Sequence, residues 1–69
     1  MNNKIEYLRK SRKITQVELA KLVGVSRQTI ISLEQSKHTA SLELAYKISQ
    51  VFNLSIEDVF DFNSYILKK

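Results

Sequence analysis

The sequence contains no cysteine and no proline, and it has a single glycine, Gly24, and a single histidine, His38. The lack of cysteine excludes a disulfide framework, and one histidine cannot build a metal site alone. No apolar run approaches the roughly 18 residues of a membrane-spanning helix, and the start of the chain lacks the apolar core of a signal peptide. We therefore expect a cytoplasmic protein with no metal, no cofactor and no membrane partner.

The chain is also too short to bury a large hydrophobic core. With 69 residues it is expected to form one domain over residues 1–69, and a domain of this size buries only about 60% of its unfolded surface. Neither a disulfide nor a metal can add to that. A second copy of the chain is the expected additional source of buried surface.

Acidic residues are scarce in the N-terminal half. Residues 1–40 hold eight Lys and Arg against three Asp and Glu, whereas residues 41–69 hold three against four. The positive field therefore belongs to the first half of the chain. It is consistent with a generic basic surface or with a face that binds a polyanion, and charge alone does not decide between them.

What the chain does have is a composition that favours helix, with abundant Leu, Ile, Ala, Lys, Glu and Gln. Residues that cap helix starts divide it into five segments. They are Asn3, Thr15, Ser26, Ser41 and Ser55, with Glu6, Glu18 and Asp58 three residues after the first, second and last. Apolar residues at helical spacing follow each cap, namely Ile5 and Leu8; Leu19, Ala20, Leu22 and Val23; Ile30 and Leu33; Leu44, Ala45, Ile48, Val51 and Phe52; and Ile56, Val59 and Phe60. The fold class is expected to be all-α.

Gly24 marks a sharp turn between the second and third helices. It lies just beyond an apolar stripe, where glycine adopts a left-handed conformation without the steric cost of a Cβ. Ser26 can cap the next helix, and Ala20 supplies a small residue where the two helices cross. Residues 16–35 are thus expected to form a helix-turn-helix. The polar run from Ser26 to Thr29 forms the first turn of the second helix of this motif. In helix-turn-helix proteins that bind DNA, this turn enters the major groove.

The segment "TQVELAKLVGVSRQTIISLEQSK" closely resembles the helix-turn-helix of the Cro/CI-type (XRE-type) DNA-binding family, which includes small repressors. The resemblance covers residues 5–60 and implies a five-helix, lambda-repressor-like fold that binds double-stranded DNA. The family often has Gly or Asn near position 36 and Pro at position 40, where this chain has Ser36 and Ala40. The loop that contains these two residues is therefore expected to be more mobile.

The residues expected to bind DNA are Gln16, Ser26, Arg27, Gln28, Thr29, Ser32, Lys37 and Thr39. Arginine suits guanine and glutamine suits adenine in the major groove, so Arg27 and Gln28 are favoured as base contacts over ordinary exposed residues. Ser32 is expected to reach a base or a phosphate. Thr29 is expected to use its hydroxyl on a phosphate, its methyl on thymine, or simply to add to the cap.

Several roles come only from the resemblance. It implies that Gln16 holds the DNA backbone at a helix start, where free amides attract phosphate. It implies backbone contacts for Lys37 and Thr39, for which a solvated loop is the alternative. It also implies that Arg9 and Glu34 form a partly buried, structural ion pair.

The tail over residues 61–69, with Phe60 before it, is rich in apolar side chains. Phe60, Phe62, Tyr65, Ile66 and Leu67 are expected either to close the monomer's own core or to form a dimer contact, with a short C-terminal β segment as one option. A dimer contact is favoured because the core is small and DNA half-sites normally come in pairs.

Two functions from different classes remain in view. The favoured one is a homodimeric transcriptional regulator, a repressor that reads a palindromic operator. The alternative is an antitoxin or protein-interaction module whose tail binds a partner protein. An enzyme is disfavoured, and no small-molecule ligand is expected, because the sequence has no cysteine, no histidine pair and no glycine-rich phosphate loop.

Overall fold

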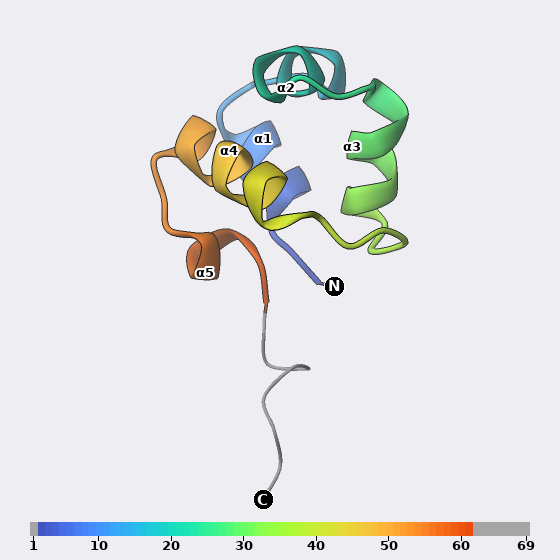
Figure 1. The fold of residues 1–69 in the computed structure, drawn as a ribbon. Helices are drawn as coiled ribbons and strands as arrows, with labels where there is room; N and C mark the ends of the chain where they lie inside the picture. Colours follow the sequence, from blue (N-terminus) through green and yellow to red (C-terminus); the bar gives the residue numbers. More distant parts are fainter. Residues whose placement is uncertain (1, 62–69) are drawn as a thin grey trace, which may run out of the picture.

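Five helices make up residues 2–61, the part of the chain that the computed structural model describes. They are α1 (Ile5–Ser11), α2 (Gln16–Val23), α3 (Arg27–Glu34), α4 (Leu42–Phe52) and α5 (Ile56–Val59). In Figure 1, α2 lies across the top, α3 descends on one side, and α4 crosses in front of α1. The all-α, five-helix fold class is confirmed. No helix within residues 2–61 is long and apolar enough to cross a membrane.

Four of the five expected caps are formed. Thr15 accepts from Glu18 N–H at 3.0 Å while Glu18 accepts from Thr15 N–H at 2.8 Å, which completes a capping box. The hydrogen bond from the Thr15 backbone N–H to the Glu18 carboxylate, followed by the effect of the Thr15 side chain, lowers the pKa of Glu18. Ser26, Ser41 and Ser55 cap α3, α4 and α5.

The first helix begins differently from the expectation. Its cap position is Lys4, which makes no side-chain cap bond, and Glu6 pairs with Lys10 at 3.0 Å instead. Asn3 still accepts from Ile5 N–H at 3.1 Å, and it donates to the Leu33 carbonyl at 2.7 Å. Asn3 therefore ties the chain's beginning to the end of α3 as well as to α1.

The helices α1 to α4 end in one shared backbone arrangement. A left-handed residue follows each helix, and the next residue donates its N–H to a carbonyl five positions back, as in a Schellman motif. The four left-handed residues are Lys13, Gly24, Ser36 and Asn53, with φ of 59°, 76°, 60° and 57°. Only Gly24 was predicted from the sequence.

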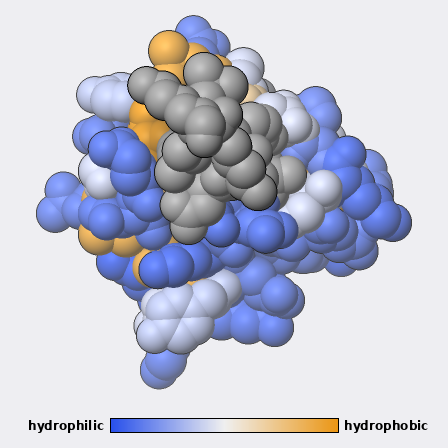
Figure 2. Space-filling model, turned by 90° about the horizontal axis from the view of Figure 1, so that it is seen from below, coloured by the Kyte–Doolittle hydropathy of each residue, from blue (hydrophilic) through white to orange (hydrophobic). Residues whose placement is uncertain are grey.

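The core gathers the apolar faces of all five helices, with one exception to the expected set. Ile5, Leu19, Ile30 and Ile48 are each 0% exposed, but Leu22 is 63% exposed. One residue step turns a helix by about 100°, so Leu22 points away when Val23 points inward. The face in Figure 2 is largely hydrophilic, with apolar surface confined to small areas.

The two ends of the described chain meet beside α5. Lys4 N–H donates to the Val59 carbonyl at 2.7 Å, and Asp61 N–H donates to the Asn2 carbonyl at 2.8 Å. Asn3 and Phe60 form an isolated antiparallel bridge, and residues 2–61 contain no sheet. Phe60 is 2% exposed, so its side chain fills the monomer core, the alternative to the dimer contact expected for it. The other expected tail contacts, Phe62, Tyr65, Ile66 and Leu67, lie outside the described residues.

Candidate nucleic-acid interface

The helix-turn-helix fixes which face of α3 is free. Ile30 and Leu33 are 0% and 1% exposed and anchor α3 from beneath, and Ala20, 3% exposed, gives the helix room to pack on α2. The first turn of α3 is thereby turned outward, with Arg27 and Gln28 exposed. The side chains of this turn can therefore contact a partner while the core stays unchanged.

A shallow hollow on this outward face collects most of the residues expected to bind DNA. It is lined by Ser26, Gln28, Thr29, Ser32, Lys37 and His38. Residues from the start of α3 and from the loop after it therefore share one surface. His38 was not expected there, because a lone histidine in a loop gives no sequence pattern that points to a site. Thr39 is exposed but does not line this hollow, and neither do Gln16 and Arg27.

Some polar groups on this face already form hydrogen bonds with one another. Ser26 Oγ accepts from Thr29 N–H at 3.2 Å, and the Ser26 and Thr29 hydroxyls lie 3.0 Å apart. A hydroxyl both donates and accepts, so each retains capacity for a further partner. Ile31, which follows buried Ile30, is partly buried.

A second hollow has Arg27 in its lining. Its lining includes Gln16, Lys10 and Lys13, together with Arg9 and Glu6. Lys10 and Lys13 were not among the residues expected to bind DNA. Their positive charge was visible in the sequence, but their closeness to Arg27 arises only when α1, α2 and α3 pack together.

Arg9 and Glu34 lie between α1 and α3 beneath this hollow. Arg9 Nε donates to Glu34 Oε2 at 2.7 Å and Arg9 Nη2 donates to Glu34 Oε1 at 3.3 Å, while Arg9 Nη1 donates to the Ile14 carbonyl at 3.0 Å. The two side chains are 9% and 5% exposed. The hydrogen bond with Glu34 raises the pKa of Arg9. This arginine thus serves the fold, because its donors are directed inward.

Gln16 joins that ion pair to Arg27. Its Nε2 donates to Glu34 Oε1 at 3.1 Å, and its Oε1 accepts from Arg27 Nε at 3.3 Å. Arg9, Glu34, Gln16 and Arg27 thus form one continuous series of hydrogen bonds, which we call the polar network. Gln16 sits at the first position of α2, and its second Nε2 hydrogen remains available to a phosphate.

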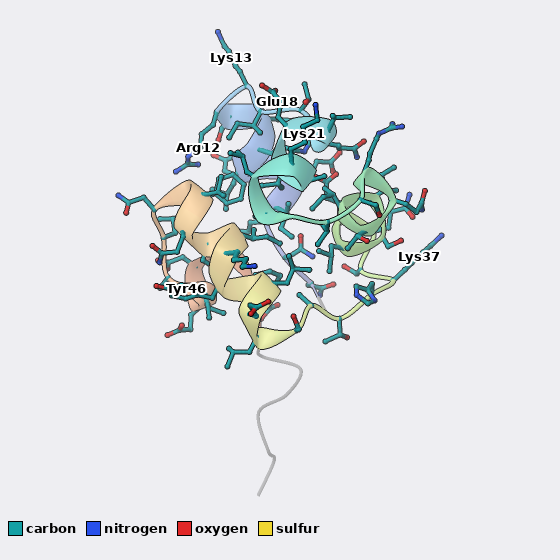
Figure 3. All side chains as sticks on the ribbon, turned by 45° about the horizontal axis from the view of Figure 1, so that its top comes forward. Arg12, Lys13, Glu18, Lys21, Lys37 and Tyr46 are labelled. Atoms are coloured by element: carbon teal, nitrogen blue, oxygen red, sulfur yellow. The ribbon has the colours of Figure 1, made fainter. Side chains whose placement is uncertain are left out.

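The basic residues divide into structural and free ones. Arg12 stacks over the Phe52 ring at 5.2 Å and donates to the Phe52 carbonyl at 3.2 Å, so it closes the end of α4. Lys37 points away from the body of the molecule, as Figure 3 shows. Its backbone N–H donates to the Ser32 carbonyl at 2.9 Å. Lys37 is therefore placed by backbone bonds while its ammonium faces solvent. Among residues 2–61, no group of acidic or histidine side chains is arranged to hold a metal ion.

Comparison with known proteins agrees with this architecture. The family model described as helix-turn-helix (HTH_3) matches residues 5–59. The chain is 52% identical over 60 residues to an HTH-type transcriptional regulator from Methanocaldococcus jannaschii, covering 87% of this chain and 91% of that one. It is 42% identical over 60 residues to the HTH-type transcriptional regulator YgzD of Bacillus subtilis, again covering 87% and 91%. It is also 40% identical over 55 residues to the antitoxin PezA of Streptococcus pneumoniae, but it spans only 35% of that protein.

Solved structures show the same fold. The clp gene regulator ClgR from Corynebacterium glutamicum matches with a TM-score of 0.73 and 26% identity over 78% of this chain, which spans 57% of ClgR. A chain of the SinR protein/SinI protein complex matches with a TM-score of 0.77 and 25% identity, covering 96% of this chain and 65% of that one. Such regulators bind DNA and are not enzymes. The chain belongs to the Cro/CI-type (XRE-type) helix-turn-helix family of transcriptional regulators.

Proposed function

We propose that this regulator is a homodimeric repressor, acting in the cytoplasm, that reads a palindromic operator with the first turn of α3 in the major groove. The observation that carries the proposal is the hollow that joins Gln28 and Ser32 of α3 to Lys37 of the following loop. It combines residues suited to base edges with a free cation suited to the backbone. Sequence-specific binding needs both kinds of contact on one face.

Base readout is assigned to Arg27 and Gln28. Both are exposed at the start of α3, the part of a recognition helix that enters the groove first. Arginine makes paired hydrogen bonds to guanine O6 and N7, and glutamine makes them to adenine N6 and N7. Ser32, one turn further along the same helix, is assigned a base or phosphate contact at the edge of the hollow.

Backbone contacts are assigned to the residues around these two. Gln16 opens α2, where unpaired amides and the helix dipole favour a phosphate. Ser26 and Thr29 offer hydroxyls at the start of α3, and Lys37 and Thr39 offer an ammonium and a hydroxyl from the exposed loop. These contacts fix the register of the protein on the duplex and carry no sequence information themselves.

The homodimer rests on a size argument. One copy of α3 covers only a few base pairs, so a second copy in the next major groove, about 34 Å away, is needed for a specific operator. We assign the contact to the tail residues Phe62, Tyr65, Ile66 and Leu67. Replacing Phe62 with Glu should give monomers with unchanged helical content that no longer bind the operator at nanomolar concentration. A wild-type protein that sediments as a monomer both free and on DNA would refute the dimer.

Selection of bound sequences from random DNA, followed by footprinting, tests the readout itself. The expected result is a two-fold symmetric motif whose half-sites are one helical turn apart. Reporter transcription that falls when the protein is expressed would establish repression. A selection that enriches no sequence would overturn the proposal.

The relation to an antitoxin favours one second function, a protein-interaction module whose tail binds a partner protein. The match to PezA covers 80% of this chain, and α4 carries two exposed apolar residues, Leu42 at 77% and Tyr46 at 55%. A toxin encoded beside this gene, forming a complex that the Phe62→Glu variant cannot form, would support this function. This function does not require α3, so it is compatible with DNA binding by that helix.

A further inference from the structure

The polar network runs from the core to the surface through four residues. It starts at Arg9 and Glu34, whose side chains are 9% and 5% exposed. It passes through Gln16, which is partly buried, and it ends at Arg27, which is exposed. A buried, charge-paired group is thereby connected to a side chain on the outer face by two hydrogen bonds, at 3.1 and 3.3 Å.

Glu34 decides which way the Gln16 amide points. An ionised carboxylate only accepts hydrogen bonds, so the Gln16 atom beside Glu34 Oε1 must be the donor Nε2. The opposite orientation would place two oxygens against each other. Glu34 itself cannot turn freely, because Arg9 holds both of its oxygens. The acceptor Oε1 of Gln16 is therefore left facing Arg27.

That acceptor engages one particular atom of the Arg27 guanidinium. Arg27 donates through Nε, which leaves the two Nη atoms for another partner. Arginine can pair with guanine either through Nε and one Nη or through both Nη atoms, and the fork is rigid. With Nε occupied, only the second mode is open.

We propose that Gln16 and Glu34 are positioning residues for base recognition: they hold Arg27 by its Nε so that it presents Nη1 and Nη2 to a guanine. The proposal rests on the proposed function and adds to it the mode of contact and the residues that set it. A side chain fixed before binding loses less conformational freedom on binding. The benefit should therefore fall on the base that Arg27 reads and not on the phosphates.

The test uses Gln16→Met in the full-length chain, because methionine keeps the length and helix propensity of glutamine but removes both hydrogen bonds. Binding is measured to the selected operator and to operators changed at one base pair at a time. We expect discrimination at the position read by Arg27 to fall about three- to tenfold, with smaller changes elsewhere. Gln16→Ala should give the same pattern, so the result does not depend on how methionine packs.

A double-mutant cycle separates positioning from a simple backbone contact. If Gln16 acts through Arg27, the Gln16→Met/Arg27→Ala double variant should discriminate no worse at that position than Arg27→Ala alone. Equal losses on all sequences, additive with Arg27→Ala, would overturn the proposal. Unchanged discrimination in Gln16→Met would also overturn it. If Arg27→Ala itself kept full discrimination, the assignment of Arg27 to readout would fail instead.

A measurement without DNA tests the same contact. The Arg27 Nε–H should give a distinct 15N-resolved NMR signal that exchanges more slowly with water than the Nε–H of an unrestrained arginine. Gln16→Met should remove that protection while amide signals from the core stay in place. An Arg27 Nε–H that exchanges equally fast in wild type and variant would refute the positioning contact.

Discussion

The connections before and after α3 share one backbone arrangement, but they differ in their side chains and in their length. Before α3, left-handed Gly24 is followed by Val25, whose N–H donates to the Ala20 carbonyl at 3.0 Å. After α3, left-handed Ser36 is followed by Lys37, whose N–H donates to the Ser32 carbonyl at 2.9 Å. The hydrogen bonds are equivalent, so they do not explain why the two joints differ.

The side chains explain the difference. Val25 packs against the hydrophobic core, whereas Lys37 is exposed. The first joint spans only residues 24–26 and fixes the angle between α2 and α3, while the second spans residues 35–41 before α4. Local stability follows buried apolar contacts. The same turn therefore serves as a rigid corner at one end and presents a cation at the other.

The largest expected effect comes from filling the rigid corner. Ala20 is 3% exposed where α2 meets α3, so Ala20→Leu should lower the free energy of unfolding by about 2–3 kcal/mol because the core cannot accept the added atoms. Urea denaturation measures it. Ala40→Leu in the longer joint is the control, with about 1 kcal/mol or less expected. Equal losses would show that the two joints are packed alike.

Removing the Arg27 side chain should have the next largest effect, and only on DNA binding. Arg27→Ala is expected to cost about 1–3 kcal/mol on the selected operator and to relax preference at one base position. Arg27→Lys keeps the charge but cannot form the paired contact, so it should lose the preference while retaining the salt dependence. Band-shift titrations on operator variants measure both. If Arg27→Ala kept full affinity and the same base preference, Arg27 would not be a base-reading residue.

Replacing the corner's glycine tests the backbone alone. A Cβ at Gly24 would meet nothing within 4 Å, so Gly24→Ala causes no steric clash. Its cost is the left-handed conformation, about 1–2 kcal/mol. Alanine also stiffens the unfolded chain, which offsets part of that cost. We expect a net loss of about 1 kcal/mol by thermal unfolding. Gly24→Asn should lose less, because asparagine tolerates this conformation. A loss as large as that of Ala20→Leu would contradict this account.

These turns also mark what could be predicted of the fold. The caps of α2 to α5 and the turn at Gly24 follow from residue types alone. The left-handed Lys13 and Ser36 do not, because lysine and serine seldom adopt this conformation and tertiary packing imposes it here, whereas asparagine tolerates it and Asn53 was simply missed. The exposure of Leu22 was missed for a related reason, since helical spacing gives an apolar stripe but not how much of it a two-turn helix can cover.

The sequence pointed to several residues of the two hollows but not to Lys10, Lys13 or His38, and not to the hydrogen bonds that connect the polar network. Side-chain chemistry and position pointed to Arg27 and Gln28, and the family resemblance pointed to Arg9 and Glu34. Nothing in the sequence placed Gln16 between Glu34 and Arg27, because that contact requires α1, α2 and α3 to be packed at a particular angle. Hydrogen bonds between distant residues depend on distances of a few tenths of an ångström, which residue spacing does not carry.

The exposed cation of the second joint should affect affinity without affecting preference. Lys37→Ala is expected to weaken binding to all DNA sequences alike, about two- to fivefold, and to reduce the salt slope by about one. Lys47→Ala is the control: Lys47 is exposed on α4 and pairs with Glu43 at 3.6 Å, away from the hollow, so its slope should not change. If both variants kept the wild-type slope, Lys37 would point to solvent in the complex too.

The smallest expected effect would make the second joint resemble the first. Ser36 holds φ at 60°, a conformation that costs a residue with a Cβ about 1–2 kcal/mol. Ser36→Gly removes that cost but loosens the unfolded chain and loses a long contact of 3.5 Å to Asn2. The net result should be a gain of about 0.5 kcal/mol, seen as a melting temperature about 2–4 °C higher. Ser36→Ala, which keeps the strain and loses only the hydroxyl, should not be stabilised. If Ser36→Gly were neutral or destabilising, the serine side chain would be compensating for its backbone. The two joints would then differ in how they offset the same strain as well as in what they pack against.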